Sequence, residues 1–600
     1  MAESASAPTA TELGELPEWD LRDLYPGPDS PELQRDLERA RQQARQLRED
    51  YEGRIAELHG DSLAVAVERY EAIEELLGRL MSYAQLYYSG DMTDPETGRF
   101  FQGMQEEATT IASDLIFFTL EINALSDAAL NARVEESSRL THYWPWLRDV
   151  RALRPHQLSD ELERFINDKQ VTGRGAWTRL FDETMAALRF PLDGEELTSS
   201  EILDKLSSPS EETRRKAGKA FGQKLGENVP TFAHIHNTLI KDKAVEDQWR
   251  GFARPISSQN LANHVEDEVV DALVSSVRKS YPRLSHRYYR LKAKWMGKDT
   301  LAYWDRNAPL PEDDDRTVPW GEARATVLGA YEAFSPRMAE IGQHFFDKRW
   351  IDAPTRAGKA PGAFSHPTVP SAHPYVLLNY QGRTRDVMTL AHELGHGVHQ
   401  YLAGQHQGAL MADTPLTLAE TASVFGEMLT FQRMLANEHD PTRRKVMLAT
   451  KVEDMINTVV RQIAFHTFEA RLHEERKHGE LLASRIGEIW LETQREALGE
   501  VFSFDEEYQH FWAYIPHFIH VPFYVYAYAF GDCLVNSLYA VYEQADSGFA
   551  EQYLEMLAAG GTKRHGELLA PFGLDAADPG FWDKGLALIE RFIDELEQYE

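Results

Sequence analysis

Hydrophobic and polar residues alternate along most of this chain with the period of an α-helix. Apolar side chains recur every three or four residues, the spacing that places them on one face of a helix. Residues 188–198 differ, because turn residues lie there between two β-favouring runs and predict a hairpin. The pattern predicts helical segments at residues 31–58, 61–89, 94–125, 126–153, 199–300 and 386–600. The sequence therefore predicts a mainly α fold.

A different pattern occupies residues 303–385. Prolines recur there and interrupt any long helix. Two short apolar runs bounded by such breakers, 362–366 and 375–380, predict strands directly before the next helical segment. The edge of such a sheet can pair with the backbone of an extended peptide, which gives affinity without sequence preference.

The helix that follows these strands carries the chemistry. Its apolar residues share one face and are Val387, Leu390, Ala391, Leu394, Val398 and Leu402. At about 100° per residue, His392 and His396 fall nearly opposite this face, and both imidazoles can reach one metal ion. Glu393 is rotated away from that ion and is placed to take a proton from water bound to it. The pattern predicts a zinc-hydrolase site.

A catalytic zinc ion takes three protein ligands and leaves one position for water. The residue six positions after His396 is Leu402, so the third ligand must come from another segment. A second helix is predicted from Pro415, which suits a first helical turn. Its apolar residues share one face, and Glu420 and Ser423 lie on the opposite one. We predict Glu420 as the third ligand.

Two further residues are candidates for supporting the ligands. Glu427 shares the polar face of the second helix and is predicted to accept a hydrogen bond from a histidine ring. The alternative for Glu427 is an ordinary helix carboxylate. His399 lies within about 20° of His392 around the first helix, so it is predicted to support the ligands or line the cleft.

Composition narrows the possible partners and location. The net charge is -33, so nucleic-acid binding is not expected, because phosphate contacts need a basic surface. Cys533 is the one cysteine, which rules out an intrachain disulfide and leaves zinc ligation to histidine and carboxylate. Residues 1–17 do not resemble a signal peptide, and no apolar run is long enough for a membrane span. A cytoplasmic location is the simplest expectation.

Three segments resemble those of the M3 peptidase family, the thimet-oligopeptidase-like metallopeptidases, and above all bacterial oligoendopeptidase F. They are TLAHELGHG at residues 389–397, LAETASVFGE at 418–427 and WDLRDLY at 19–25. The spacing of 24 residues from His396 to Glu420 also fits. The resemblance implies a two-lobed, all-helical ellipsoid with a deep substrate channel and a small β-sheet beside the zinc-binding helix. Such a channel would admit short unstructured peptides and exclude folded proteins.

The expected organisation along the chain has three parts. Residues 1–17 are predicted to be a flexible tail. By resemblance, residues 18–200 would form an N-terminal helical domain of the oligopeptidase F type, and residues 201–600 an M3 catalytic domain.

The family also implies a histidine- and tyrosine-bearing segment near the C-terminus that binds substrate and stabilises the oxyanion. Here the candidates are His517, His520, Tyr524 and Tyr528. Tyr524 and Tyr528 would share a helix face, whereas Tyr526 would point away. Ordinary aromatic packing is the alternative explanation for these tyrosines.

We therefore predict a zinc-dependent endopeptidase that hydrolyses oligopeptides, with one Zn²⁺ per chain. Glu393 would act as general base and then return the proton to the leaving amine. The ligand set also tolerates cobalt or manganese. Two alternatives stay open, a helical zinc carboxypeptidase and a catalytically inert peptide-binding protein. Oligopeptides are the expected partners, and the sequence does not predict the oligomeric state.

Overall fold

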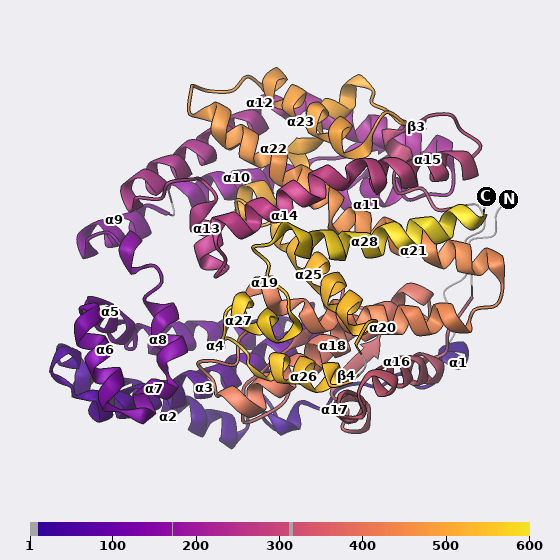
Figure 1. Ribbon diagram of the computed structural model, residues 1–600. Helices are drawn as coiled ribbons and strands as arrows, with labels where there is room; N and C mark the ends of the chain where they lie inside the picture. Colours follow the sequence, from indigo (N-terminus) through magenta and orange to yellow (C-terminus); the bar gives the residue numbers. More distant parts are fainter. Residues whose placement is uncertain (1–9, 171, 311–315, 546, 600) are drawn as a thin grey trace. The chain divides into compact units, whose positions relative to one another are not determined.

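The structure is a computed structural model and describes residues 10–170, 172–310, 316–545 and 547–599. Helices dominate the described residues and the sheets are small, which confirms the predicted mainly α fold (Figure 1). The chain divides into two compact units. Unit 1 contains residues 1–154, 315–437 and 544–573, and unit 2 contains residues 155–314, 438–543 and 574–600. The domain boundary predicted at residue 200 and the substrate channel stay predictions.

Unit 1 contains the metal-site candidates of the sequence. Its N-terminal helices are α1 (Ala10–Leu13), α2 (Pro31–Tyr51), α3 (Gly60–Gly90), α4 (Pro95–Ser113), α5 (Ile116–Ala124), α6 (Asp127–Glu136), α7 (Ser138–His142) and α8 (Trp144–Val150). Its other helices are α16 (Trp320–Phe334), α17 (Pro336–Asp347), α18 (Thr384–Gln407), α19 (Leu416–Ala419), α20 (Thr421–Asn437), α26 (Phe549–Ala558) and α27 (His565–Leu569). Its strands are β4 (Ile351–Pro354), β5 (Phe364–His366) and β6 (Tyr375–Tyr380).

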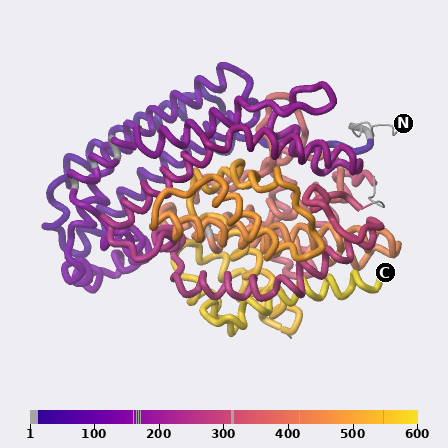
Figure 2. Tube along the Cα trace, turned by 90° about the horizontal axis from the view of Figure 1, so that it is seen from above, coloured from indigo at the N-terminus to yellow at the C-terminus, as the bar shows by residue number. Residues whose placement is uncertain are grey.

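The long helices α2, α3 and α4 pack side by side in unit 1, drawn in indigo in Figure 2. Ser30 caps α2 and Pro31 occupies its first turn. Apolar residues spaced three or four apart on α2 are buried, and its charged residues face solvent. The buried residues of α2 are Leu33, Leu37, Ala40, Ala44 and Leu47.

A three-stranded sheet with the order β4-β6-β5 lies directly before α18 in the chain and packs against it. Strand β6 pairs parallel with β4 and antiparallel with β5. This confirms the two strands predicted from the sequence and the small sheet beside the histidine helix. Within the described part of the chain, β5 pairs with one strand only, and the Ser365 carbonyl accepts a hydrogen bond from Gln400 of α18.

Two expectations for unit 1 need correction. The proline-rich region was not expected to hold long helices, yet α16 and α17 lie within it. The prolines at the starts of these helices, Pro319 and Pro336, occupy the N-cap and the first turn, where proline costs no hydrogen bond. The predicted flexible tail, residues 1–17, is also wrong at its C-terminal end, where the chain packs against the rest of unit 1. Leu13 is buried and the Ala353 amide donates to the Pro17 carbonyl, while residues 1–9 lie outside the described residues.

Unit 2 holds the remaining elements. Its helices are α9 (Asp160–Gln170), α10 (Arg174–Ala187), α11 (Ser199–Lys205), α12 (Glu211–Arg250), α13 (Ser257–Ala262), α14 (Asp267–Ser280), α15 (Ser285–Trp295), α21 (Pro441–Thr458), α22 (Val460–Arg476), α23 (Ala483–Leu498), α24 (His517–His520), α25 (Tyr526–Tyr542) and α28 (Pro579–Leu596). The strands are β1 (Phe190–Leu192), β2 (Glu195–Leu197), β3 (Leu301–Ala302) and β7 (Phe502–Ser503).

The core of unit 2 is aromatic and includes Phe221, Phe468, Trp490, Phe511 and Trp512. The antiparallel pair β1 and β2 confirms the predicted hairpin, and its turn is made by two residues with positive φ, Asp193 and Gly194.

No single helix among the described residues is both long and apolar enough to cross a membrane. The segments Pro95–Ala124 and Asp127–Glu136 pass that test only as a pair, and they meet at 101°.

Candidate metal centre

Helix α18 places the two histidines as the sequence pattern predicts. Asp386 caps its start by accepting hydrogen bonds from the Gln381 and Arg383 amides. The predicted apolar stripe is buried from Val387 to Leu402. His392 and His396 lie on the other side of the helix and are partly exposed. The helix therefore packs by one face and presents its histidines from the other.

A close approach of α18 and α20 brings the third candidate ligand to the histidines. Gly395 makes this approach possible, because a Cβ at this position would lie 2.4 Å from the Ala422 carbonyl oxygen and 2.8 Å from Ser423 Cα. Side chains larger than hydrogen do not fit at such distances. The glycine inside the histidine motif thus has a packing role that the motif alone does not reveal.

The segment that carries Glu420 is not the continuous helix predicted from Pro415. Helix α19 covers Leu416–Ala419, Glu420 follows as its C-cap with φ -77° and ψ -1°, and α20 begins at Thr421. Pro415 is the N-cap of α19 rather than a residue of its first turn. Glu420 therefore lies at a break between two helices, with its carboxylate directed toward α18.

The three candidate ligands converge on one point. Glu420 Oε2 lies 3.4 Å from His392 Nε2 and 3.5 Å from His396 Nε2. One ligand atom from each of the three residues lies within 4.8 Å of the others. Ligands of a tetrahedral zinc ion, each about 2.0–2.1 Å from the metal, lie about 3.3–3.4 Å apart. The residues present fit a metal ion of this kind.

Glu427 and Ser423 orient two of the candidate ligands. Glu427 Oε2 lies 3.3 Å from His392 Nδ1, the ring nitrogen that does not face Glu420. Such a contact fixes the tautomer that leaves Nε2 free to bind a metal. Ser423 donates a 2.7 Å hydrogen bond to Glu420 Oε2 and so orients the carboxylate.

We expect Glu427→Ala to lower metal affinity by about 10–100-fold, because the His392 ring loses the acceptor that orients it. Glu427→Gln should recover much of the affinity, since an amide oxygen still accepts from Nδ1. Competition with a chromophoric chelator measures both variants. Wild-type affinity in Glu427→Ala would instead make Glu427 an ordinary helix carboxylate.

The charges around the ligands favour a cation. Burial opposes protonation of His392, but the hydrogen bond to Glu427 and the charge of Glu420 outweigh it and raise its pKa to about 9. Burial alone would raise the pKa of Glu420, yet the hydrogen bond and charge of His396 lower it to about 2. The carboxylates thus stabilise positive charge on this cluster, whether a proton or a metal ion supplies it.

Glu393 lies next to the ligands and is 8% exposed. Burial raises its pKa, and the charges of His392 and His396 and a hydrogen bond from the Ser365 amide of β5 oppose this rise. Strand β5 is held against α18 by Gln400, which accepts from Ser365 Oγ at 2.7 Å and donates to the Ser365 carbonyl. A carboxylate with a raised pKa beside the candidate metal ligands is suited to take up a proton.

His399 supports the loop that leads to Glu420. It is buried, and its Nε2 lies 3.1 Å from the Thr414 hydroxyl. A backbone hydrogen bond with Ala419 also involves this ring, and burial with the charge of His396 lowers the pKa of His399 to about 4. A neutral His399 thus connects α18 to both ends of the segment before Glu420. The sequence could place His399 on the correct side of α18 but could not identify these partners.

The C-terminal candidates all belong to unit 2, and the structure groups three of them. His517 Nε2 lies 3.2 Å from the Tyr528 hydroxyl, and the ring of Tyr524 stacks on His517 with centroids 5.7 Å apart. His520 is directed elsewhere, with Nε2 2.8 Å from Asp182 Oδ1. Tyr526 is buried, and its hydroxyl accepts from Asn263 Nδ2. Their part in binding substrate stays a prediction.

Comparison with known proteins identifies the family. A family model described as peptidase family M3 matches residues 205–588, and a second, described as oligopeptidase F, matches residues 121–190. Oligopeptidase PepF of Bacillus subtilis (strain 168) is 27% identical over all of this chain and 90% of its own length. An oligoendopeptidase F homolog of Lactococcus lactis subsp. lactis (strain IL1403) is 26% identical, over 99% of this chain and 98% of its own.

Solved structures share the fold. A putative peptidase from Chlamydophila abortus has a TM-score of 0.86 at 23% identity, covering 99% of this chain and 100% of its own. Oligoendopeptidase-F from Enterococcus faecium has a TM-score of 0.69 at 22% identity, covering 94% of this chain and 97% of its own. The first family match spans more than half of the chain and includes the metal-site candidates His392, His396 and Glu420. This chain therefore belongs to peptidase family M3, a family of metallopeptidases, and is a peptidase.

Proposed function

We propose that this peptidase is a zinc-dependent endopeptidase that cleaves internal bonds of short, unstructured oligopeptides. His392, His396 and Glu420 would hold the zinc ion. The observation that carries the proposal is the triangle of ligand atoms, whose 3.4 and 3.5 Å separations match a tetrahedral zinc site, with Glu393 beside it. Two histidines and one carboxylate are the ligand set of many zinc hydrolases, although cobalt or manganese can occupy the same set.

When bound, zinc lowers the pKa of a coordinated water molecule and polarises the carbonyl of the scissile peptide bond. Glu393 would take the proton from the attacking water and deliver it to the leaving amine. Burial of Glu393 suits both steps, because it brings the pKa of the carboxyl closer to neutral pH. Glu427 and Ser423 would keep His392 and Glu420 oriented throughout.

Strand β5, at the edge of the sheet, supports a peptide as substrate. An extended peptide can pair with such an edge strand through backbone hydrogen bonds, without regard to its side chains. It would replace the bonds that the Ser365 amide and carbonyl make to Glu393 and Gln400, which would bring it to the proposed general base. The names of the relatives, oligopeptidase and oligoendopeptidase F, support oligopeptides as substrates and cleavage at internal bonds.

A quenched-fluorescence peptide blocked at both ends tests this function directly. We expect cleavage, loss of cleavage with a chelator, and recovery when zinc is restored. A carboxypeptidase needs a free C-terminal carboxylate, so cleavage of free peptides alone would favour that alternative. Bound zinc without cleavage of any member of a mixed peptide library, analysed by mass spectrometry, would favour the inert peptide-binding protein.

We expect Glu420→Ala to lower zinc occupancy sharply, because it removes one of three ligands and the carboxylate that offsets the positive charge of the metal. Elemental analysis of the purified variant measures the zinc content per chain. Glu49→Ala is the matched control, since Glu49 is an exposed glutamate of α2 in the same unit. Unchanged zinc content in Glu420→Ala would remove Glu420 from the ligand set.

A further inference from the structure

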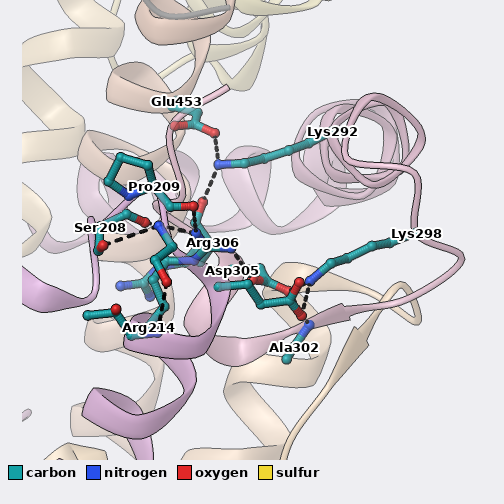
Figure 3. Close-up of polar contacts among 12 residues, drawn as sticks. Ser208, Pro209, Arg214, Lys292, Lys298, Ala302, Asp305, Arg306 and Glu453 are labelled. Carbon is teal, nitrogen blue, oxygen red and sulfur yellow. Dashed lines mark hydrogen bonds and ion pairs between the residues drawn. The ribbon is translucent and has the colours of Figure 1, made fainter. Parts of the chain in front are cut away.

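Unit 2 contains a group of buried ionic residues that lies outside the proposed metal centre (Figure 3). Asp305, which is fully buried, accepts hydrogen bonds from Arg214 at 2.8 Å and Lys298 at 2.7 Å. Lys292, also fully buried, pairs with Glu453 and donates to the Arg306 carbonyl at 2.8 Å. These charges are compensated, as buried charges need to be.

The positive charges of two arginines beside this group, Arg306 and Arg461, are not offset by ion pairs of this kind. Within the described residues, no carboxylate forms an ion pair with Arg306 or Arg461, although the charge of Glu453 acts on Arg306, and the Nε of each arginine is buried without a hydrogen-bond partner. Arg461 donates to one neutral group, the Tyr514 hydroxyl, at 3.0 Å. Burial and the positive charge of Arg306 lower the pKa of Arg461. Each side chain as a whole is partly exposed, but two neighbouring positive charges with buried, unpartnered Nε–H groups favour an acceptor that is negatively charged.

The same two arginines line one small cavity. It is enclosed by α15, α21, α22 and α23, and the residues that line it are Tyr289, Arg306, Ile456, Asn457, Val460, Arg461, Ala464, Gln494, Ala497 and Leu498. Gln494 is 2% exposed, and its amide nitrogen Nε2 is buried without a partner. The cavity has a volume of about 10 Å³, which is close to the least that holds one water-sized particle.

We propose that this cavity binds a monatomic anion of the size of chloride, held by Arg306, Arg461 and Gln494. Their unpartnered N–H groups are donors, so they suit an acceptor that is negatively charged. A water molecule would accept a hydrogen bond but would bring no negative charge to offset the repulsion between the two guanidinium groups. A carboxylate or phosphate group has several heavy atoms and needs more room than this cavity offers. The anion would connect α22 and α23 to the segment after β3 and stabilise unit 2.

Thermal unfolding tests the proposal, with sodium chloride exchanged for sodium gluconate at constant ionic strength. We expect chloride to raise Tm by about 1–3 °C, with saturation, because a ligand that binds only the folded state stabilises it. Arg461→Gln should lose the chloride response. Arg471→Gln is the matched control, because Arg471 lies on the same helix and pairs with Glu492 at the surface, and it should keep the response.

A crystal grown in bromide gives an independent measurement on the unaltered chain. We expect an anomalous peak in the cavity, between Arg306 and Arg461. A Tm that does not distinguish chloride from gluconate overturns the proposal, as does an Arg461→Gln variant that responds like the wild type. If Arg461→Gln does not fold, the crystal decides, since a cavity without bromide overturns the proposal.

Discussion

Glu393→Gln is expected to lower kcat by roughly 10²–10⁴-fold while zinc content stays at one ion per chain. The amide cannot accept the proton of the attacking water, and this is the contribution that general acid–base catalysis makes to the rate. Metal binding should persist, because Glu393 contacts the Ser365 amide rather than belonging to the ligand triangle. Steady-state kinetics on the blocked fluorogenic peptide, together with elemental analysis, measures both quantities.

The matched control is Glu49→Gln, a neutralised carboxylate on the exposed face of α2, which should leave both quantities unchanged. A variant with a low kcat and a normal zinc content has lost proton transfer rather than structure, because a misfolded site would lose its metal as well. Near-wild-type kcat in Glu393→Gln would remove Glu393 from the mechanism.

Gly395→Ala is expected to disrupt the metal site without altering any ligand. The new Cβ would lie 2.4 Å from the Ala422 carbonyl oxygen, so α18 and α20 must move apart. Overpacking of this kind costs about 1–3 kcal/mol, and it separates the histidines from Glu420. We expect a lower Tm and a fall of about 100-fold or more in zinc affinity, because the ligands no longer share one point.

Gly404→Ala is the matched control on the same helix. A Cβ there meets its nearest atom, Pro370 Cα, at 3.6 Å, which is ordinary contact. Alanine is the better helix former, so Gly404→Ala should fold at least as stably as the wild type and bind zinc normally. If Gly395→Ala also binds zinc normally, the close approach of α18 and α20 is not required for the site.

The sequence predicted those parts of the site that depend on helical period. Both histidines and the apolar stripe of α18 follow from one repeating pattern, and Glu420 follows from the polar face of the next segment. The break at Glu420 could not be predicted in this way. It is stabilised by contacts to Thr414 and Ala419 from His399, which is distant in sequence. The pattern of hydrophobic and polar residues within one segment contains no information about partners in another segment.

The errors in the fold prediction have a similar origin. The prolines of residues 303–385 predict interrupted helices, but Pro319 and Pro336 each lie at the start of a helix, where no amide hydrogen bond is needed. The contact between Ser365 and Glu393 depends on how β5 packs on α18, and the unpaired arginines of unit 2 depend on segments more than 150 residues apart. Only the folded chain brings these residues together.

The most direct test of the metal centre is a crystal structure of the zinc-loaded chain with anomalous data at the zinc edge. We expect one strong peak about 2.0–2.2 Å from His392 Nε2, His396 Nε2 and a Glu420 carboxylate oxygen, with Glu393 outside bonding distance. A peak at any other set of residues, or zinc bound directly by Glu393, would contradict it.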